Sequence, residues 1–168
     1  MTANRRDLLR GAGALALSAA AIALFRPFGV AASEMFEVTK TDAEWKALLK
    51  PDAYAVLRQA STEYPNTSKL LNEHRKGKFA CAGCDLALFD DSQKFDSGTG
   101  WPSFFDHLAD AIATKTDKEL LSARTEVHCR RCGGHLGHVF DDGPKPTGLR
   151  YCMNGVALMF HPADGSGA

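Results

Sequence analysis

The sequence lacks any excess of basic charge. Its 168 residues include 20 lysines and arginines against 20 aspartates and glutamates. Residues 1–32 hold four arginines and one aspartate, so the rest of the chain has 16 basic and 19 acidic residues and a net charge of −3. Nucleic-acid binding usually depends on a basic face that neutralises phosphates. A nucleic-acid partner is therefore not expected.

An apolar run long enough to span a membrane is also lacking. The stretch from Gly11 to Phe25 is short and rich in alanine and glycine. It follows the pair Arg5-Arg6 and precedes the small residues Val30-Ala31-Ala32. This order is typical of a cleavable export signal, and the paired arginines resemble a twin-arginine signal. We predict cleavage after Ala32; an uncleaved anchor is the alternative.

The predicted export route indicates where the protein acts and where a metal could be bound. The twin-arginine pathway carries folded proteins, so a metal could be bound in the cytoplasm before the thiols meet an oxidising compartment. We therefore expect a periplasmic protein that meets the membrane only through its export signal.

Internal repeats and low-complexity runs are absent from the sequence, apart from a doubled C-x2-C motif and a short Gly/Ser-rich tail after Asp164. The length that remains after the signal fits one domain. We predict an export signal over residues 1–32, a linker over 33–40, one domain over 41–161 and a flexible tail over 162–168.

Local patterns predict short helices first and strands afterwards. Thr41 and Glu44 form a capping-box pattern, and Trp45, Leu48 and Leu49 share one helical face before Pro51 ends the helix. Further short helices are expected over 52–59 and 68–74. Apolar runs separated by Gly, Asp and Pro predict strands over 86–89, 125–128, 136–140 and 156–160. The pattern indicates a mainly β, antiparallel domain with helices at its N-terminal side.

Four of the five cysteines form two matched pairs, Cys81-Ala-Gly-Cys84 and Cys129-Arg-Arg-Cys132. Two C-x2-C turns supply the four thiolates that structural zinc prefers. We predict one structural zinc ion per chain, which staples together two loops distant in sequence. Two disulfides or two dithiol redox centres are the alternatives.

The fifth cysteine, Cys152, is unpaired. On an extended strand, Arg150, Cys152 and Asn154 would share one face, because residues two apart point the same way. A guanidinium there would favour the thiolate, the reactive form, and Asn154 could donate a hydrogen bond. A buried structural cysteine is the alternative.

Two more clusters could carry chemistry. His135, His138, Asp141 and Asp142 lie within eight residues and could supply general acid catalysis near neutral pH, extra metal ligands or only a polar turn. Trp101 lies between Gly100 and Pro102. A loop tryptophan there suits a small apolar pocket, although a core position is common.

Together these stretches resemble the B type of methionine sulfoxide reductase, which acts on the R epimer of the sulfoxide. The resemblance is carried by Lys94–Phe104 (KFDSGTGWPSF), His135–Pro144 (HLGHVFDDGP) and Gly148–Asn154 (GLRYCMN), and both C-x2-C pairs match the family's zinc-bearing members. It spans roughly residues 40 to 160. It implies two antiparallel β-sheets with short flanking helices, and a structural zinc remote from the catalysis.

The resemblance also implies a role for each residue. Cys152 attacks the sulfoxide sulfur and becomes a sulfenic acid, while His138 protonates the departing oxygen. His135 and Asn154 shape the pocket, and Trp101 packs against the S-methyl group. Arg150 keeps Cys152 as a thiolate, and Asp142 orients the histidines or the water network. The expected substrates are oxidised proteins that contain methionine-R-sulfoxide.

The chain departs from the family pattern at Thr99, where many members carry a resolving cysteine. The expected reductant is therefore an external thiol, either a thioredoxin-like protein or a small thiol; release of a zinc cysteine is the alternative. Met153, Gly155 and Val156 also differ from the commoner residues, which bears on substrate fit. Two rival functions are a zinc-stapled binding or chaperone domain, and a zinc hydrolase with His135 and His138 as ligands.

Overall fold

The structure is a computed structural model that describes residues 35–117 and 124–165. These residues belong to one compact unit, Glu34–Ala168. The predicted export signal lies outside the described residues, as does the end of the predicted tail. No helix in the described part of the chain is long and apolar enough to cross a membrane.

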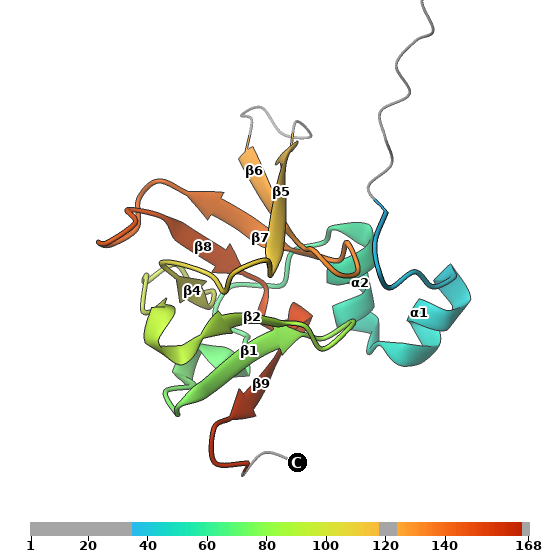
Figure 1. Cartoon of the computed structure of the whole chain (residues 1–168), viewed down its shortest axis with the longest axis horizontal. Coiled ribbons are helices and arrows are strands. Elements are labelled where there is room, and N and C mark those ends of the chain that lie inside the picture. The colour runs from blue at the N-terminus through green and yellow to red at the C-terminus, as the bar shows by residue number, and fades with distance from the viewer. Residues whose placement is uncertain (1–34, 118–123, 166–168) are drawn as a thin grey trace, which may run out of the picture. The chain divides into compact units, whose positions relative to one another are not determined.

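Two antiparallel sheets form the domain (Figure 1), which confirms the predicted mainly β fold. The smaller sheet has the strand order β2-β1-β9, with bounds Ala87–Asp90, Gly77–Cys81 and Leu158–Pro162. The larger sheet has the order β3-β4-β8-β7-β6-β5, with bounds Lys94–Phe95, Ser103–Phe104, Arg150–Met153, His135–Phe140, Arg124–Cys129 and Ile112–Asp117.

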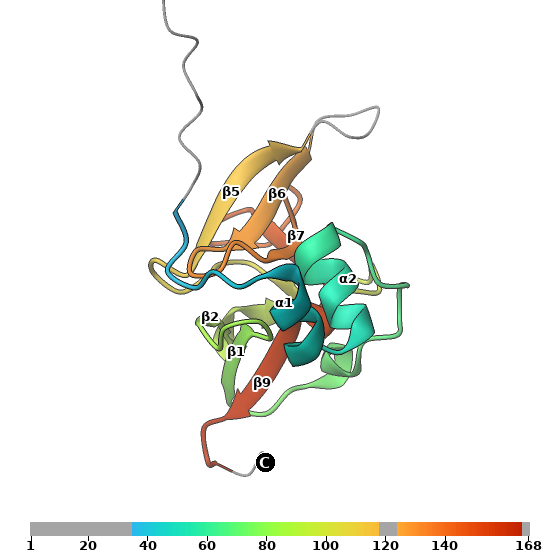
Figure 2. The same ribbon diagram turned by 90° about the vertical axis from the view of Figure 1, so that its right-hand side faces the viewer.

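The helices are short and gather at one flank of the sheets, as both views show (Figures 1 and 2). Helix α1 spans Asp42–Leu48 and α2 spans Pro51–Gln59; the 3-10 turns are η1 (Lys69–Asn72), η2 (Asp91–Gln93) and η3 (Gly155–Ala157). The predicted capping box is present, because Thr41 Oγ1 accepts from Glu44 N and the Glu44 side chain accepts from Thr41 N. Pro51 breaks the helix as expected and then begins α2, where its missing N–H costs nothing.

One predicted helical face is only partly correct. Trp45 and Leu49 are buried, but Leu48 is 55% exposed. Leu48 is the last residue of α1, and the chain has already left the helix at Leu49, which has extended backbone angles. The change of direction turns Leu49, rather than Leu48, toward the core.

The core lies between the two sheets and is dominated by aromatic rings. Phe79 on β1 and Phe89 on β2 both pack against Phe104 on β4, with ring centroids 5.0 and 4.3 Å away. All three side chains are fully buried. The smaller sheet is thereby fixed to the larger one beneath the strand that carries Cys152, since β4 is the neighbour of β8.

The predicted strands match β2, β6 and β7 closely, but β1, β3, β4 and β5 were not predicted. Strand β5 (sequence IATKTD) lies at the edge of its sheet and is largely exposed, so it lacks the apolar run that marks a buried strand. Strand β1 is only five residues long and includes a lysine. The strand expected over 156–160 begins later, because Gly155–Ala157 form the turn η3.

The predicted linker, residues 33–40, contacts the domain where it is described. Val38 N donates to Arg131 O at 3.0 Å, and Glu37 forms an ion pair with Arg130 at 2.9 Å. The ring of Phe36 packs edge-on against His128. Residues 36–38 therefore lie against the turn that carries the second C-x2-C pair.

Candidate active site

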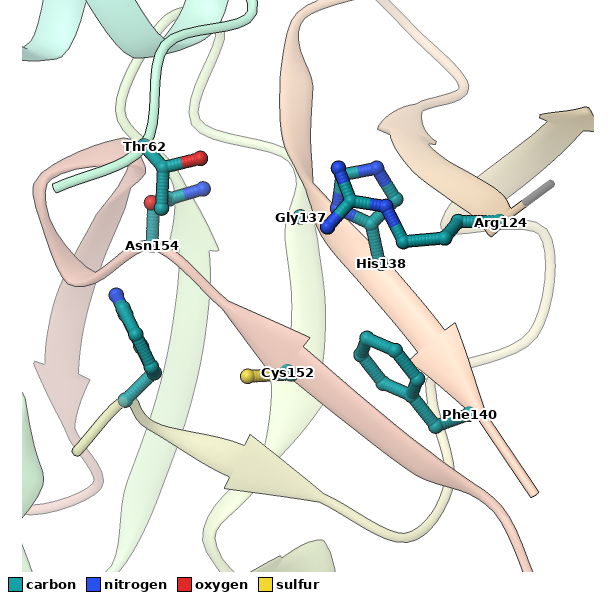
Figure 3. A pocket seen from close by; sticks show the side chains of 8 residues that line it. Thr62, Arg124, Gly137, His138, Phe140, Cys152 and Asn154 are labelled. Carbon is teal, nitrogen blue, oxygen red and sulfur yellow. The ribbon is translucent and has the colours of Figure 1, made fainter. Parts of the chain in front are cut away.

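A small open cavity of about 120 Å³ lies over the larger sheet (Figure 3). Cys152, from β8, lines it together with His138, which is its register partner on β7. Side chains directly opposite each other on an antiparallel pair point to the same face. The cavity is lined by Thr62, Trp101, Arg124, Gly137, His138, Phe140, Cys152 and Asn154.

Cys152 is half-buried, and burial raises the pKa of its thiol. Two neighbours act in the opposite direction: Thr99, whose Oγ1 lies 3.9 Å from Sγ, and the Arg150 guanidinium both lower this pKa. Burial outweighs them. The pKa of Cys152 therefore lies above its usual value, although Arg150 acts on it in the predicted, lowering direction.

Arg150 is held by Asp142 in a two-bond ion pair. Its Nε and Nη2 donate to the two carboxylate oxygens of Asp142, each at 2.8 Å, and its guanidinium lies 4.4 Å from the ring centre of Phe140. The carboxylate of Asp142 therefore contacts Arg150 rather than a histidine, and each histidine has an acid from another strand. A role of Asp142 in a water network stays a prediction.

The two histidines of β7 have different surroundings. His138 lines the cavity, and its Nε2 lies 3.0 Å from Oδ2 of Asp117 on β5. His135 is 4% exposed and does not line the cavity; its Nδ1 lies 2.9 Å from Oε1 of Glu126 on β6. The two ring centres are 5.4 Å apart, so the buried ring of His135 packs edge-on against His138.

Sequence reasoning missed both acids, and the register of the β5–β6 pair explains their positions. Lys115 is opposite Glu126, and Asp117 is opposite Arg124. Lys115 Nζ lies 3.0 Å from Glu126, and Arg124 Nη2 lies 3.9 Å from Asp117. Spacing by two places each acid on the same sheet face as a cation of its own strand.

Asn154 and Trp101 are joined by a loop that sequence reasoning also missed. Trp101 Nε1 donates to Glu63 O at 3.1 Å, and Glu63 N donates to Asn154 Oδ1 at 3.0 Å. Asn154 Nδ2 donates to Leu136 O at 3.0 Å. With both ends of its amide bonded to backbone, Asn154 holds the wall of the cavity at the point where the chain passes from β8 into η3.

The same loop is fixed by a carboxylate. Glu63 accepts from the backbone N–H groups of Gly155 and Val156, at 2.5 and 3.2 Å. Burial raises the pKa of Glu63, while these two hydrogen bonds lower it in part. Thr62, the neighbour of Glu63, lines the cavity.

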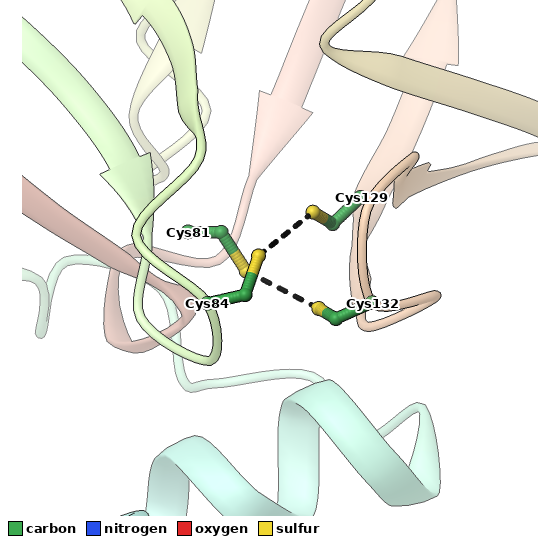
Figure 4. A group of neighbouring side chains, drawn as sticks. All are labelled: Cys81, Cys84, Cys129 and Cys132. Atoms are coloured by element: carbon green, nitrogen blue, oxygen red, sulfur yellow. Dashed lines mark hydrogen bonds between the residues drawn. The ribbon is translucent and has the colours of Figure 1, made fainter. Parts of the chain in front are cut away.

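The four remaining cysteines form a separate cluster (Figure 4). Their sulfur atoms all lie within 4.8 Å of one another, and the cross-pairs Cys81–Cys132 and Cys84–Cys129 are 3.7 and 3.5 Å apart. Sulfurs bound to one zinc ion at about 2.3 Å in a tetrahedron lie about 3.8 Å apart, whereas a disulfide needs about 2.05 Å. The four residues are thus placed to bind a metal ion.

The cluster also has the chemistry of a cation site. Hydrogen bonds from Cys132, Cys81 and Cys84 lower the pKa of the Cys129 thiol. None of the four cysteines lines the cavity. Among the described residues, this is the one group of three or more Cys, His, Asp or Glu that could hold a metal, so the histidines provide no support for a zinc hydrolase.

Comparison with known proteins identifies the family. Residues 49–162 match the SelR domain. A peptide methionine sulfoxide reductase MsrB of Thiobacillus denitrificans is 52% identical over 126 residues, which cover 74% of this chain and 96% of that protein. The protein of the same name from Pseudomonas putida is 51% identical and covers 79% and 100%.

The chain belongs to the methionine sulfoxide reductase B family.

This membership confirms the resemblance drawn from the motifs, and with it the oxidoreductase class. A third MsrB, from Leifsonia xyli, is 51% identical over 131 residues, which cover 77% of this chain and 94% of that protein. The matched region contains Trp101, His138, Cys152 and Asn154, the four predicted site residues that line one cavity. The rival reading as a binding module without turnover therefore loses its support.

Proposed function

We propose that the protein reduces methionine-R-sulfoxide in oxidised proteins to methionine, with Cys152 as the nucleophile. The observation that carries the proposal is the position of Cys152 opposite His138 in a cavity that also contains Trp101. A nucleophile, a proton donor and an apolar wall thus surround one small volume, as this reaction needs.

The chemical step transfers one oxygen atom. The Cys152 sulfur attacks the sulfoxide sulfur as its thiol proton leaves, and His138 protonates the sulfoxide oxygen. The resulting hydroxyl group then moves from the methionine sulfur to the Cys152 sulfur while the bond between the two sulfurs breaks, so methionine departs and Cys152 is left as a sulfenic acid. Arg150 and Thr99 stabilise the transient thiolate, since both lower the pKa of Cys152 against the effect of burial.

Trp101 gives the cavity its substrate preference in this proposal. Its indole N–H is bonded to Glu63 O, so the ring is held in place by its polar edge. A fixed ring of this kind suits the S-methyl group of the substrate and leaves room for only one arrangement of the sulfoxide substituents.

Two thiols from outside the chain regenerate Cys152. Thr99 is the side chain next to the sulfur, and the only other cysteines of the sequence are the four of the metal cluster. One external thiol displaces water from the sulfenic acid to form a mixed disulfide, and a second releases Cys152. A thioredoxin-like protein or a small thiol can supply both.

The four-cysteine cluster binds zinc in this proposal. Cys81, Cys84, Cys129 and Cys132 would hold the ion, which would supply structural stability by joining the turn after β1 to the turn after β6. The chemistry at Cys152 needs no step at this cluster.

The protein acts in the periplasm, after export by the twin-arginine route. The support is the sequence order of Arg5-Arg6, an apolar stretch and Val30-Ala31-Ala32. Replacement of Arg5 and Arg6 by lysine should leave the precursor in the cytoplasm, as cell fractionation would show. Export at the normal level would contradict the proposed route.

A stereospecific assay tests the activity. Dabsylated methionine-R-sulfoxide should be reduced in the presence of a thiol, and the S epimer should not. Cys152→Ser should remove the activity and keep the metal content. Turnover by this variant, or reduction of the S epimer alone, would refute the proposal.

A further inference from the structure

The two histidines of β7 each bond to an acid, and each acid is paired with a cation on the opposite strand. Glu126 on β6 pairs with Lys115 on β5, whereas Asp117 on β5 pairs with Arg124 on β6. The burial of the two acids differs, because the side chain of Glu126 is 9% exposed and that of Asp117 is 18% exposed. Glu126 is thus the more buried of the two acids that contact a histidine.

The contact between His135 and Glu126 defines which ring nitrogen carries the proton. His135 and Lys115 lower the pKa of Glu126 more than burial raises it, so Glu126 is a carboxylate and can only accept hydrogen bonds. Nδ1 of His135, 2.9 Å from Oε1, must therefore be the donor. Lys115 holds the other oxygen, Oε2, at 3.0 Å and keeps the carboxylate in place.

The second nitrogen of His135 is then an acceptor. Burial lowers the pKa of His135 despite the neighbouring Glu126, so the ring is neutral and Nε2 carries a lone pair. This atom is buried and has no hydrogen-bond partner among the described residues. The ring lies edge-on to His138, 5.4 Å between centres.

We propose that Glu126 is a positioning residue for the reductase, which holds His135 in its Nδ1–H form so that Nε2 stays an acceptor next to His138, the proposed proton donor. A protonated Nε2 at that place would be a buried donor without an acceptor in the part of the chain that the structure describes. An acceptor instead can receive a hydrogen bond from a water or a hydroxyl group next to His138. The role goes beyond the nucleophile and proton donor and rests on the proposed function for its effect on rate.

The first test is the protonation form of His135 in the folded, metal-bound wild-type protein. Two-bond ¹H–¹⁵N correlation spectra distinguish a ring protonated at Nδ1 from one protonated at Nε2. We expect the Nδ1–H form for His135. The Nε2–H form would overturn the proposal, whatever the enzymatic activity of the protein.

The second test is Glu126→Gln. A neutral amide can accept from Nδ1 or donate to it, so both forms of His135 should appear in the spectra. The kcat should fall about 10- to 100-fold, as for loss of other groups that orient a catalytic histidine, while KM stays within about 2-fold. The matched control is Glu73→Gln, which makes the same change at a surface ion pair with Arg75 and should leave kcat and the spectra unaltered.

The outcomes separate this inference from the proposed function. If Glu126→Gln keeps one Nδ1–H form and the wild-type kcat, the positioning role is refuted. If this variant does not fold, the wild-type spectrum still decides. If Cys152→Ser remains active, the proposed function fails. The effect of Glu126 on His135 is then judged only from the ¹H–¹⁵N spectra.

Discussion

His138 lies directly opposite Cys152 on the neighbouring strand, and both side chains line one cavity. The pair joins an imidazole to a thiol whose pKa is raised by burial. A raised pKa slows unwanted oxidation of the free thiol, because oxidants attack the thiolate. In the proposed reaction, proton transfer depends on His138 and on the groups that lower the pKa of Cys152.

Replacement of His138 by glutamine should lower kcat for methionine-R-sulfoxide by a factor of about 10² to 10⁴, the usual contribution of a general acid. The size of the side chain is similar, so thermal unfolding should change little. Steady-state assays with a saturating thiol would measure the effect. A variant with full activity would assign the proton transfer to another group.

Loss of Arg150 should move the reactivity of Cys152 to higher pH. The guanidinium lowers the pKa of the thiol, while Asp142 raises it, so Arg150→Gln removes the favourable charge and leaves the unfavourable one. The thiolate is the form that reacts, so the alkylation rate at neutral pH should fall and its midpoint should shift upward. Iodoacetamide kinetics across about pH 6 to 11 would show the shift.

A double variant provides the control. Arg150→Gln with Asp142→Asn removes both charges, so its midpoint should lie below that of the single variant. An unchanged midpoint in Arg150→Gln would mean that the guanidinium does not act on the thiol.

The metal cluster should contribute stability rather than chemistry. Cys84→Ser removes one of the four candidate ligands at a half-buried position, so the metal content should fall. The free energy of unfolding should fall by several kcal/mol. Zinc analysis and thermal denaturation would measure both. Cys152→Ser is the matched control, since the same substitution outside the cluster should keep the zinc and the unfolding temperature. Full stability of Cys84→Ser would argue against a structural metal.

The sequence was sufficient to predict the fold class and two residues that meet in the cavity, His138 and Cys152, because local patterns carry that information. Paired C-x2-C turns, the capping box at Thr41 and the motif around Cys152 are each short and continuous. Asp117 and Glu126 could not be found in this way, because their contacts with His138 and His135 depend on the register of three strands. The available signal was the spacing by two of Lys115 and Asp117 and of Arg124 and Glu126.

The direction of the pKa shift of Cys152 could not be predicted from the sequence for a related reason. Arg150 indicated a lowered pKa, and the guanidinium does act in that direction. The opposing effect is burial, which arises from the surroundings of β8 in the folded sheet and has no local signature. Asp142 likewise appeared beside the histidines in sequence, but the ion pair to Arg150 directs it elsewhere.

Thr99→Cys should convert the site into one with its own resolving thiol. Oγ1 of Thr99 lies 3.9 Å from the Cys152 sulfur, so a cysteine there needs only a small movement to form a disulfide. After one equivalent of substrate without reductant, mass spectrometry should show a sulfenic acid in the wild type. The variant should show an intramolecular disulfide, whose mass is lower by one water than that of the corresponding sulfenic acid. A disulfide between Cys152 and a cluster cysteine in the wild type would instead show that the metal site supplies the resolving thiol, and a stable sulfenic acid in Thr99→Cys would show that the two side chains cannot meet.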